Sequence, residues 1–172
     1  MITLTPAEEG LQAVLITMAR SAAAHDLTAS PRILLNAGVT MAYGEMAREL
    51  DPDGALGWND GGHYKRLTHT LYHVNTYELE HRRPMVGAFA VSKASPHTSG
   101  SGFAGMARDA GLDAPGDDDA QGQTRFWRGQ LTASADHWST HPDGAPLTDV
   151  QFDAIMSELT TIKRMLRSLL HG

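Results

Sequence analysis

The sequence predicts a mostly helical α+β protein with a winged-helix-like core and an appended C-terminal helix. Two capping boxes, at residues 5–8 and 148–151, mark the starts of amphipathic helices near the two ends of the chain. Between them, helical patterns at 41–50 and 63–81 are followed by an apolar segment at 85–91. Helix, turn, helix and strand in this order are typical of a winged-helix module.

The first helix is predicted from its capping residues and from the spacing of its apolar residues. Thr5 stands at the N-cap, Pro6 at the first helical position and Glu8 at the third. The residues expected to face the core are Leu11, Val14, Leu15, Met18 and Ala22. A second, short helical segment is predicted within residues 30–38.

The central elements are predicted from breakers and from the apolar pattern between them. A short helix at 41–50 is stopped by the turn residues at 51–54, and a longer helix follows at 63–81. Pro84 ends this longer helix, because a proline disfavours helical geometry in the residue before it. Residues 85–91 are apolar on both faces, which predicts a covered strand.

The C-terminal helix is separated from the rest by a segment rich in Pro and Gly. We therefore expect a domain at 1–138, a linker at 139–147 and an amphipathic helix at 148–172. Large apolar residues recur in this helix at alternating intervals of three and four residues, a pattern of period 3.5, namely Phe152, Ile155, Leu159, Ile162, Leu166 and Leu169. Such a seam packs either on the first helix of the same chain or on a second copy in a homodimer.

The composition limits the classes of function. The chain has 172 residues with 41% hydrophobic and 20% charged residues, which is ordinary for a globular domain. It contains no cysteine, so thiol catalysis, disulfides and Cys-ligated zinc are excluded. The N-terminal residues lack the pattern of a secretory signal and no apolar run is long enough for a membrane span, so a cytoplasmic location is expected.

Positive charge is concentrated in the middle of an acidic protein. Residues 60–108 carry six Lys and Arg against three Asp and Glu, whereas the whole chain has a formal net charge of −6. A local basic surface of this kind can bind an anion or a nucleic acid. The candidate binding residues are Lys65, Arg66, His69, His73, Arg82, Arg83, Lys93, Ser101 and Gly102. We therefore expect a DNA-binding or otherwise nucleic-acid-associated accessory or regulatory protein.

Two alternatives stay open beside that expectation. One is a non-enzymatic protein-interaction module that uses the C-terminal seam. The other is an enzyme with a phosphate pocket at the Gly100-Ser101-Gly102 turn, because glycines at a helix start let an anion approach backbone N–H groups. His69 and His73 are four residues apart on a helix, as metal ligands can be, but without a third ligand at suitable spacing we expect no metal and no cofactor.

Part of the chain resembles a group of small uncharacterised bacterial proteins in which a "GRP-L-alVV-K" strand precedes a "PG-GF" turn. The matching residues are the run 82–91 with Lys93, then Gly100, Gly102 and Phe103, and downstream the aromatic residues of 126–138. Ser99 stands where that group usually has Pro, and Gln130 where it usually has Glu. The resemblance implies a fold and no particular activity.

A shorter similarity is to the DNA-binding half of alkyltransferase-like proteins. Residues 39–47 resemble the "TYGELA" helix that precedes a recognition helix in those proteins. The "PCHR" active site is absent, and a chain without cysteine cannot accept an alkyl group on sulfur. The resemblance therefore implies a helix-turn-helix layout only.

Overall fold

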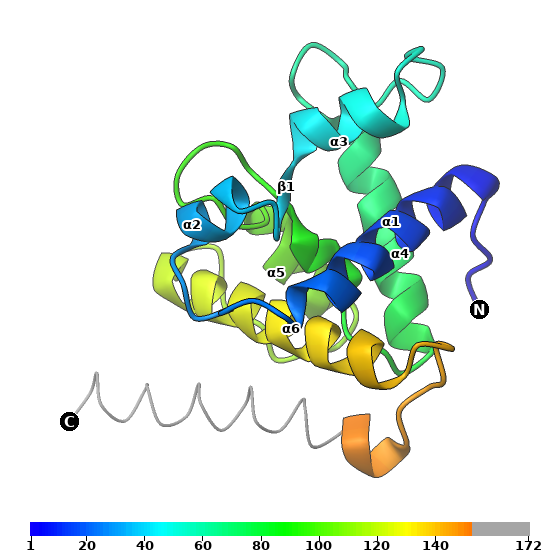
Figure 1. Ribbon diagram of the computed structural model, residues 1–172, viewed down its shortest axis with the longest axis vertical. Helices are drawn as coiled ribbons and strands as arrows, with labels where there is room; N and C mark the ends of the chain where they lie inside the picture. Colours follow the sequence, from blue (N-terminus) through cyan, green and yellow to red (C-terminus); the bar gives the residue numbers. More distant parts are fainter. Residues whose placement is uncertain (153–172) are drawn as a thin grey trace.

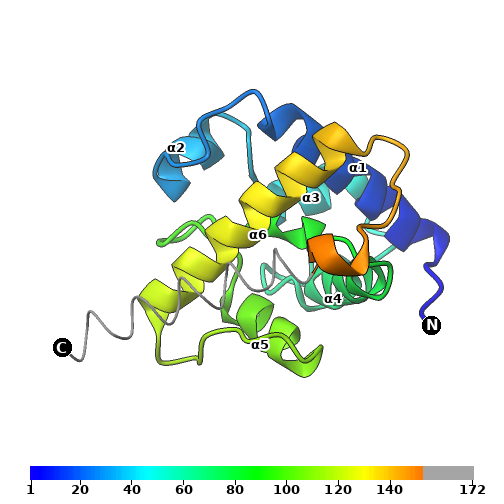
Figure 2. The same ribbon diagram turned by 90° about the horizontal axis from the view of Figure 1, so that it is seen from below.

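The computed structural model describes residues 1–152 and consists mainly of helices around one buried turn. The elements run in the order α1 (Pro6–Ala22), α2 (Pro31–Asn36), β1 (Met41–Ala42), α3 (Tyr43–Leu50), α4 (Lys65–Glu80), the 3₁₀ helix η1 (Val86–Phe89), β2 (Ala90–Val91), α5 (Ser101–Asp109) and α6 (Ala120–Thr140). Figure 1 shows α6 running below the other labelled helices, and Figure 2 shows α2 on one side of α6 and α4 and α5 on the other.

The helix starts predicted from capping residues are confirmed, whereas the helix predicted from residue 41 is wrong there, because Met41–Ala42 is a strand and α3 begins at Tyr43. The Thr5 side chain accepts from the backbone N–H of Glu8, and the Glu8 carboxylate accepts from the backbone N–H of Thr5. Ser30 caps α2 in the same way. Gln151 and Thr148 form the second capping box, and a helix begins at residue 149.

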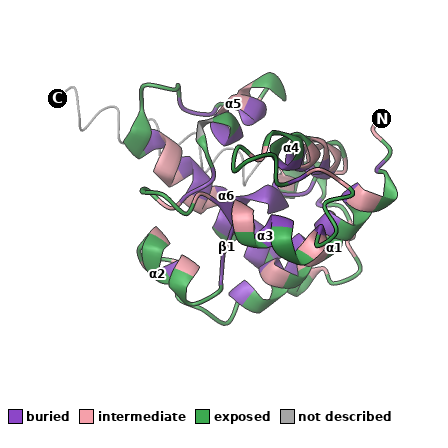
Figure 3. Ribbon diagram, turned by 90° about the horizontal axis from the view of Figure 1, so that it is seen from above, coloured by how far each residue is buried: buried purple, intermediate pink, exposed green. Residues whose placement is uncertain are grey.

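The apolar segment 85–91 lies at the centre of the core, but the prediction of a strand along its whole length is wrong. Val86–Phe89 forms a 3₁₀ turn, and only Ala90–Val91 pairs with Met41–Ala42, in parallel. Helices α1, α4 and α6 all pack against the turn, so it is covered on every side. Figure 3 shows the buried residues gathered in this central region.

Side chains replace the missing ladder partners of the central turn. The backbone N–H of Met85 donates to Gln130 at 3.1 Å, and the indole N–H of Trp127 donates to the carbonyl of Ala88 at 2.8 Å. Both side chains come from α6. A buried backbone group needs a partner, and Gln130 and Trp127 supply it for the central turn.

The two strands of the described region pair in parallel, whereas the wing of a winged helix is an antiparallel hairpin. What the structure supports is therefore a mostly helical α+β protein with a small sheet. Helix α4 ends at Glu80, and Arg82 takes a left-handed conformation (φ 54°) two residues before Pro84. The Arg83 N–H then bonds back to the carbonyl of Glu78, as in a helix C-cap motif.

The predicted linker at 139–147 contacts the rest of the domain. Leu147 is buried, and its backbone N–H bonds to the carbonyl of Arg82. The carbonyl of Gly144 accepts from Arg83 at 3.2 Å. Five of the six residues of the predicted C-terminal seam, Ile155, Leu159, Ile162, Leu166 and Leu169, lie outside the described residues, as does any homodimer contact they make.

Candidate functional site

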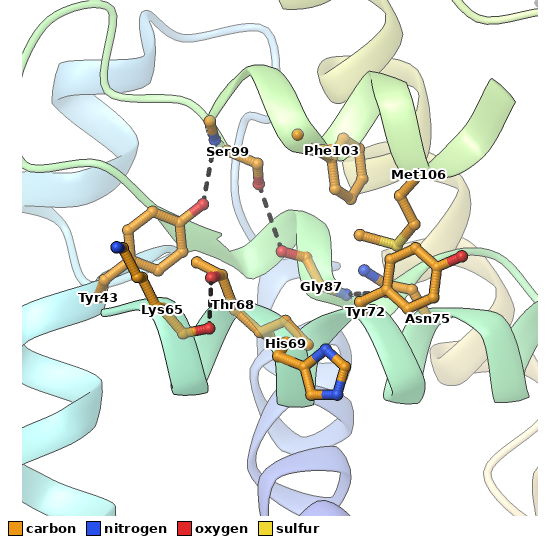
Figure 4. Close-up of a pocket in the computed structure, with 13 residues that line it drawn as sticks. Tyr43, Lys65, Thr68, His69, Tyr72, Asn75, Gly87, Ser99, Phe103 and Met106 are labelled. Carbon is orange, nitrogen blue, oxygen red and sulfur yellow. Dashed lines mark hydrogen bonds between the residues drawn. The ribbon is translucent and has the colours of Figure 1, made fainter. Parts of the chain in front are cut away.

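A groove lies between α4 and α5. It has a volume of about 470 Å³ and lies where α5 packs on α6 rather than closely on α4. Figure 4 shows side chains of α4 on one side and of α5 and the preceding loop on the other. The groove is lined by Tyr43, Lys65, Thr68, His69, Leu71, Tyr72, Asn75, Gly87, Ser99, Gly100, Gly102, Phe103 and Met106.

Asn75 is the buried polar side chain on the floor of the groove. Its exposed fraction is 1%, and its Oδ1 accepts from the backbone N–H of Gly87 at 2.8 Å. Its Nδ2 has no hydrogen-bond partner among the described residues. The amide oxygen is thus held by the central turn, and a donor is left over inside the groove.

Gly87 is required for this arrangement because a Cβ there would lie 2.3 Å from Asn75 Nδ2. We expect Gly87→Ala to lower the free energy of unfolding by about 2 kcal/mol, since it displaces Asn75 and its hydrogen bond. Gly10→Ala is the matched control, because a Cβ at Gly10 meets nothing within 4 Å. Since alanine favours a helix more than glycine does, this variant should raise the free energy of unfolding by up to about 1 kcal/mol. Urea denaturation measures both, and equal stability of the two variants would contradict the close packing at Gly87.

Tyr43 and Ser99 fix the backbone at one end of the groove. The Tyr43 hydroxyl accepts from the backbone N–H of Gly100 at 3.0 Å, and burial raises the pKa of this phenol. The Ser99 hydroxyl lies 2.7 Å from the carbonyl of Ala90 and 3.3 Å from that of Gly87. Since it donates to backbone carbonyls rather than to a base, Ser99 has the environment of a structural serine and not of a nucleophile.

The charged groups at the groove are cationic or neutral. Lys65 is exposed at the start of α4 and makes no ion pair within residues 1–152. His69 lies one turn further along, and its ring centroid is 4.5 Å from that of His73. No Asp or Glu is among the lining residues. The groove therefore favours an anion over a cation.

The structure brings together three of the sequence-predicted site residues, Lys65, His69 and Gly102. Arg66 does not line the groove and lies over the loop at Gly57. His73 is directed to α1, where its Nδ1 lies 2.8 Å from a carboxylate oxygen of Glu8. Although burial opposes the effect, hydrogen bonds from Thr5 and His73 lower the pKa of Glu8.

The remaining predicted residues lie elsewhere. Arg82 forms an ion pair with Asp149, and Arg83 is buried against Glu78, so neither guanidinium is a free cation on a shared basic face. Lys93 is exposed in the loop after β2 and does not line the groove. Ser101 begins α5, and its side chain is outside what the structure describes.

The Arg83–Glu78 pair belongs to the core rather than to a surface. Their Nε and Oε2 atoms are 3.0 Å apart, and the Glu78 side chain is fully buried. Gln12 of α1 donates to the same carboxylate at 2.5 Å. The guanidinium also lies over the rings of Tyr77 and Trp138, at 5.4 Å and 5.3 Å. Burial raises the pKa of Glu78, and the charge of Arg83 opposes that effect.

Sequence reasoning considered Asn75 only as a side chain that could reach a base edge, and it did not select Tyr43 or Phe103. Asn75 carried a usable signal, because it lies on the same helical face as Leu71 and Val74 and is the polar residue in an apolar stripe. Tyr43 and Phe103 carried none, because only the tertiary structure brings the starts of α3 and α5 beside α4.

In the part of the chain that the structure describes, no three His, Asp or Glu side chains are placed to hold a metal ion. No described helix is both long and apolar enough to cross a membrane.

Comparison with known proteins adds no identification. No protein-family model matches the chain, and no curated protein or solved structure is significantly similar to it.

Proposed function

We propose that this protein binds a small anionic ligand with a flat, partly apolar body in the groove between α4 and α5. The observation that carries the proposal is the buried Asn75 side chain, which belongs to the lining of the groove and whose amide nitrogen has no hydrogen-bond partner among the described residues. Support also comes from the lining, which is apolar at Leu71, Phe103 and Met106 and has Lys65 at the rim. Small-ligand sites combine these features, an apolar concave wall with a few directed polar groups.

Lys65→Ala tests the proposal on an exposed side chain whose loss should not affect folding. We expect the affinity for phenyl phosphate, a ring joined to an anion, to fall roughly tenfold at low salt, because one charge-assisted contact is lost. Lys93→Ala is the matched control, since it removes the same charge outside the groove. Chemical-shift titration by NMR measures both affinities. No binding of phenyl phosphate or of any nucleoside monophosphate at millimolar concentration, or equal losses in the two variants, would exclude the proposal.

A nucleic-acid-associated role is the second candidate function, and a winged-helix-like layout is the fold that we propose with it. The observation in its favour is that Lys65, Arg66 and His69 are all exposed near the start of α4. Because duplex binding depends on phosphate contacts, it should weaken steeply with salt. A labelled DNA duplex can be titrated against the same two lysine variants at low salt. If Lys93→Ala weakens duplex binding as much as Lys65→Ala does, a broad basic surface binds the duplex rather than the groove.

A further inference from the structure

The groove has an electropositive end. Helices α4 and α5 both begin at this end, where Figure 4 places Lys65, Tyr43 and Ser99. The N-caps of the two helices, Tyr64 and Gly100, make no side-chain capping bond to the first turn. First-turn N–H groups and the helix dipoles therefore add partial positive charge to that of the Lys65 ammonium.

The opposite end of the groove has aromatic and apolar walls with one directed donor. Tyr72, Asn75 and Met106 lie together there in Figure 4, and Phe103 contributes a further ring. The residue Asn75 is 1% exposed, and its Nδ2 needs an acceptor that the described protein does not supply. A ligand that carries a carbonyl oxygen or a ring nitrogen at this end would supply the acceptor that the Asn75 amide lacks, which a plain hydrocarbon chain would not.

The distance between the two ends sets the length of the ligand. Lys65 and Asn75 are ten residues apart on α4, which corresponds to about 15 Å along the helix axis. The lysine side chain extends over part of this length, and the cavity of about 470 Å³ is larger than an inorganic anion. A phosphate or sulfate alone would fill only the positive end and leave the apolar end unused.

We propose, on the basis of the anion-binding function above, that the ligand is a nucleotide unit. Its phosphate lies at Lys65 and the starts of α4 and α5, and its base lies against Tyr72 and Phe103. An acceptor on the base edge receives the hydrogen bond of Asn75 Nδ2. A nucleotide joins an anion, a planar ring and an edge acceptor in one molecule, and aromatic side chains commonly stack on unpaired bases.

The nucleotide can be free or can be an unpaired residue at the end of a strand. Both present the same phosphate, sugar and base to the groove. The exposed Arg66 and His63 lie outside the groove lining but close in sequence to Lys65, where they would meet the neighbouring phosphates of a strand. The chain length of the probe therefore distinguishes the two sources.

The test compares probes that lose one feature at a time. Each of the four common nucleoside 5′-monophosphates is titrated by calorimetry beside ribose 5-phosphate, inorganic phosphate, phenyl phosphate and a short single strand with a 5′-phosphate. We expect at least one nucleotide to bind about tenfold more tightly than ribose 5-phosphate and phenyl phosphate. Tyr72→Ala should reduce that affinity about tenfold, because the stacking of the base on the ring is lost. The ring is exposed, so its removal should leave the fold intact.

Gly102→Leu blocks the groove without crowding the protein, because a Cβ at Gly102 meets nothing within 4 Å. It should abolish nucleotide binding at an unchanged melting temperature. Phenyl phosphate that binds as tightly as every nucleotide would overturn the nucleotide assignment and leave the anion-binding function standing. Absence of binding by all probes would overturn both. Tighter binding of the strand than of every mononucleotide identifies the strand end as the source, and equal binding identifies the free nucleotide.

Discussion

Arg83→Met is expected to lower the free energy of unfolding by about 3–5 kcal/mol, the largest loss from any single substitution considered. The guanidinium is paired with the fully buried Glu78 carboxylate, and it donates to the carbonyl of Gly144 at 3.2 Å. Its removal leaves a carboxylate without a countercharge in the core. It also removes the contact with the Trp138 ring at 5.3 Å. Urea denaturation at neutral pH measures the loss.

The double variant Glu78→Leu, Arg83→Met separates an uncompensated charge from lost packing. When both charges are removed together, no buried ion remains without a partner, so most of the stability should return. Arg82→Met is the matched control, because its ion pair with Asp149 is exposed and should contribute less than about 1 kcal/mol. A double variant as unstable as Arg83→Met alone would show that the arginine acts by packing and not by charge.

His137 is expected to make the protein less stable as the pH falls from about 6.5 to about 4. The side chain is 3% exposed, and neither ring nitrogen has a hydrogen-bond partner in the described part of the chain. Burial is the main cause that lowers the pKa of His137 to about 4, and the charges of His141 and Arg83 lower it further, against an opposite effect of Asp143. Between these pH values the unfolded chain binds a proton at this histidine and the folded protein does not.

Stability contributed by neutral His137 is therefore complete above pH 6.5 and is lost as the pH approaches 4. The difference between the two pKa values corresponds to a loss of up to about 3 kcal/mol. His137→Leu should remove this part of the pH dependence, whereas His25→Leu, at an exposed histidine, should keep it. Urea denaturation between pH 7 and pH 4 gives the slopes. Parallel curves for the wild type and His137→Leu would show that this histidine is not the source.

The sequence determined where the helices after Thr5 and Thr148 start, because a capping box is a local interaction. Thr5 with Glu8 and Thr148 with Gln151 each satisfy backbone groups within four residues, so no distant contact is needed to predict them. The apolar stripe of α4 was likewise visible in the sequence. Of the candidate site, Lys65, His69 and Gly102 could be predicted from the sequence as basic or turn residues, but not that they line one groove.

Only the tertiary structure decided the conformation of 85–91 and the place of each arginine. An apolar run does not show whether a strand, or side chains such as Asn75, will satisfy its backbone groups. Arg82 and Arg83 are adjacent in sequence and equally charged, yet the left-handed turn at Arg82 directs Arg83 into the core, where Glu78 neutralises it. Charge is a property of the sequence, but its exposure depends on what the rest of the chain packs against it.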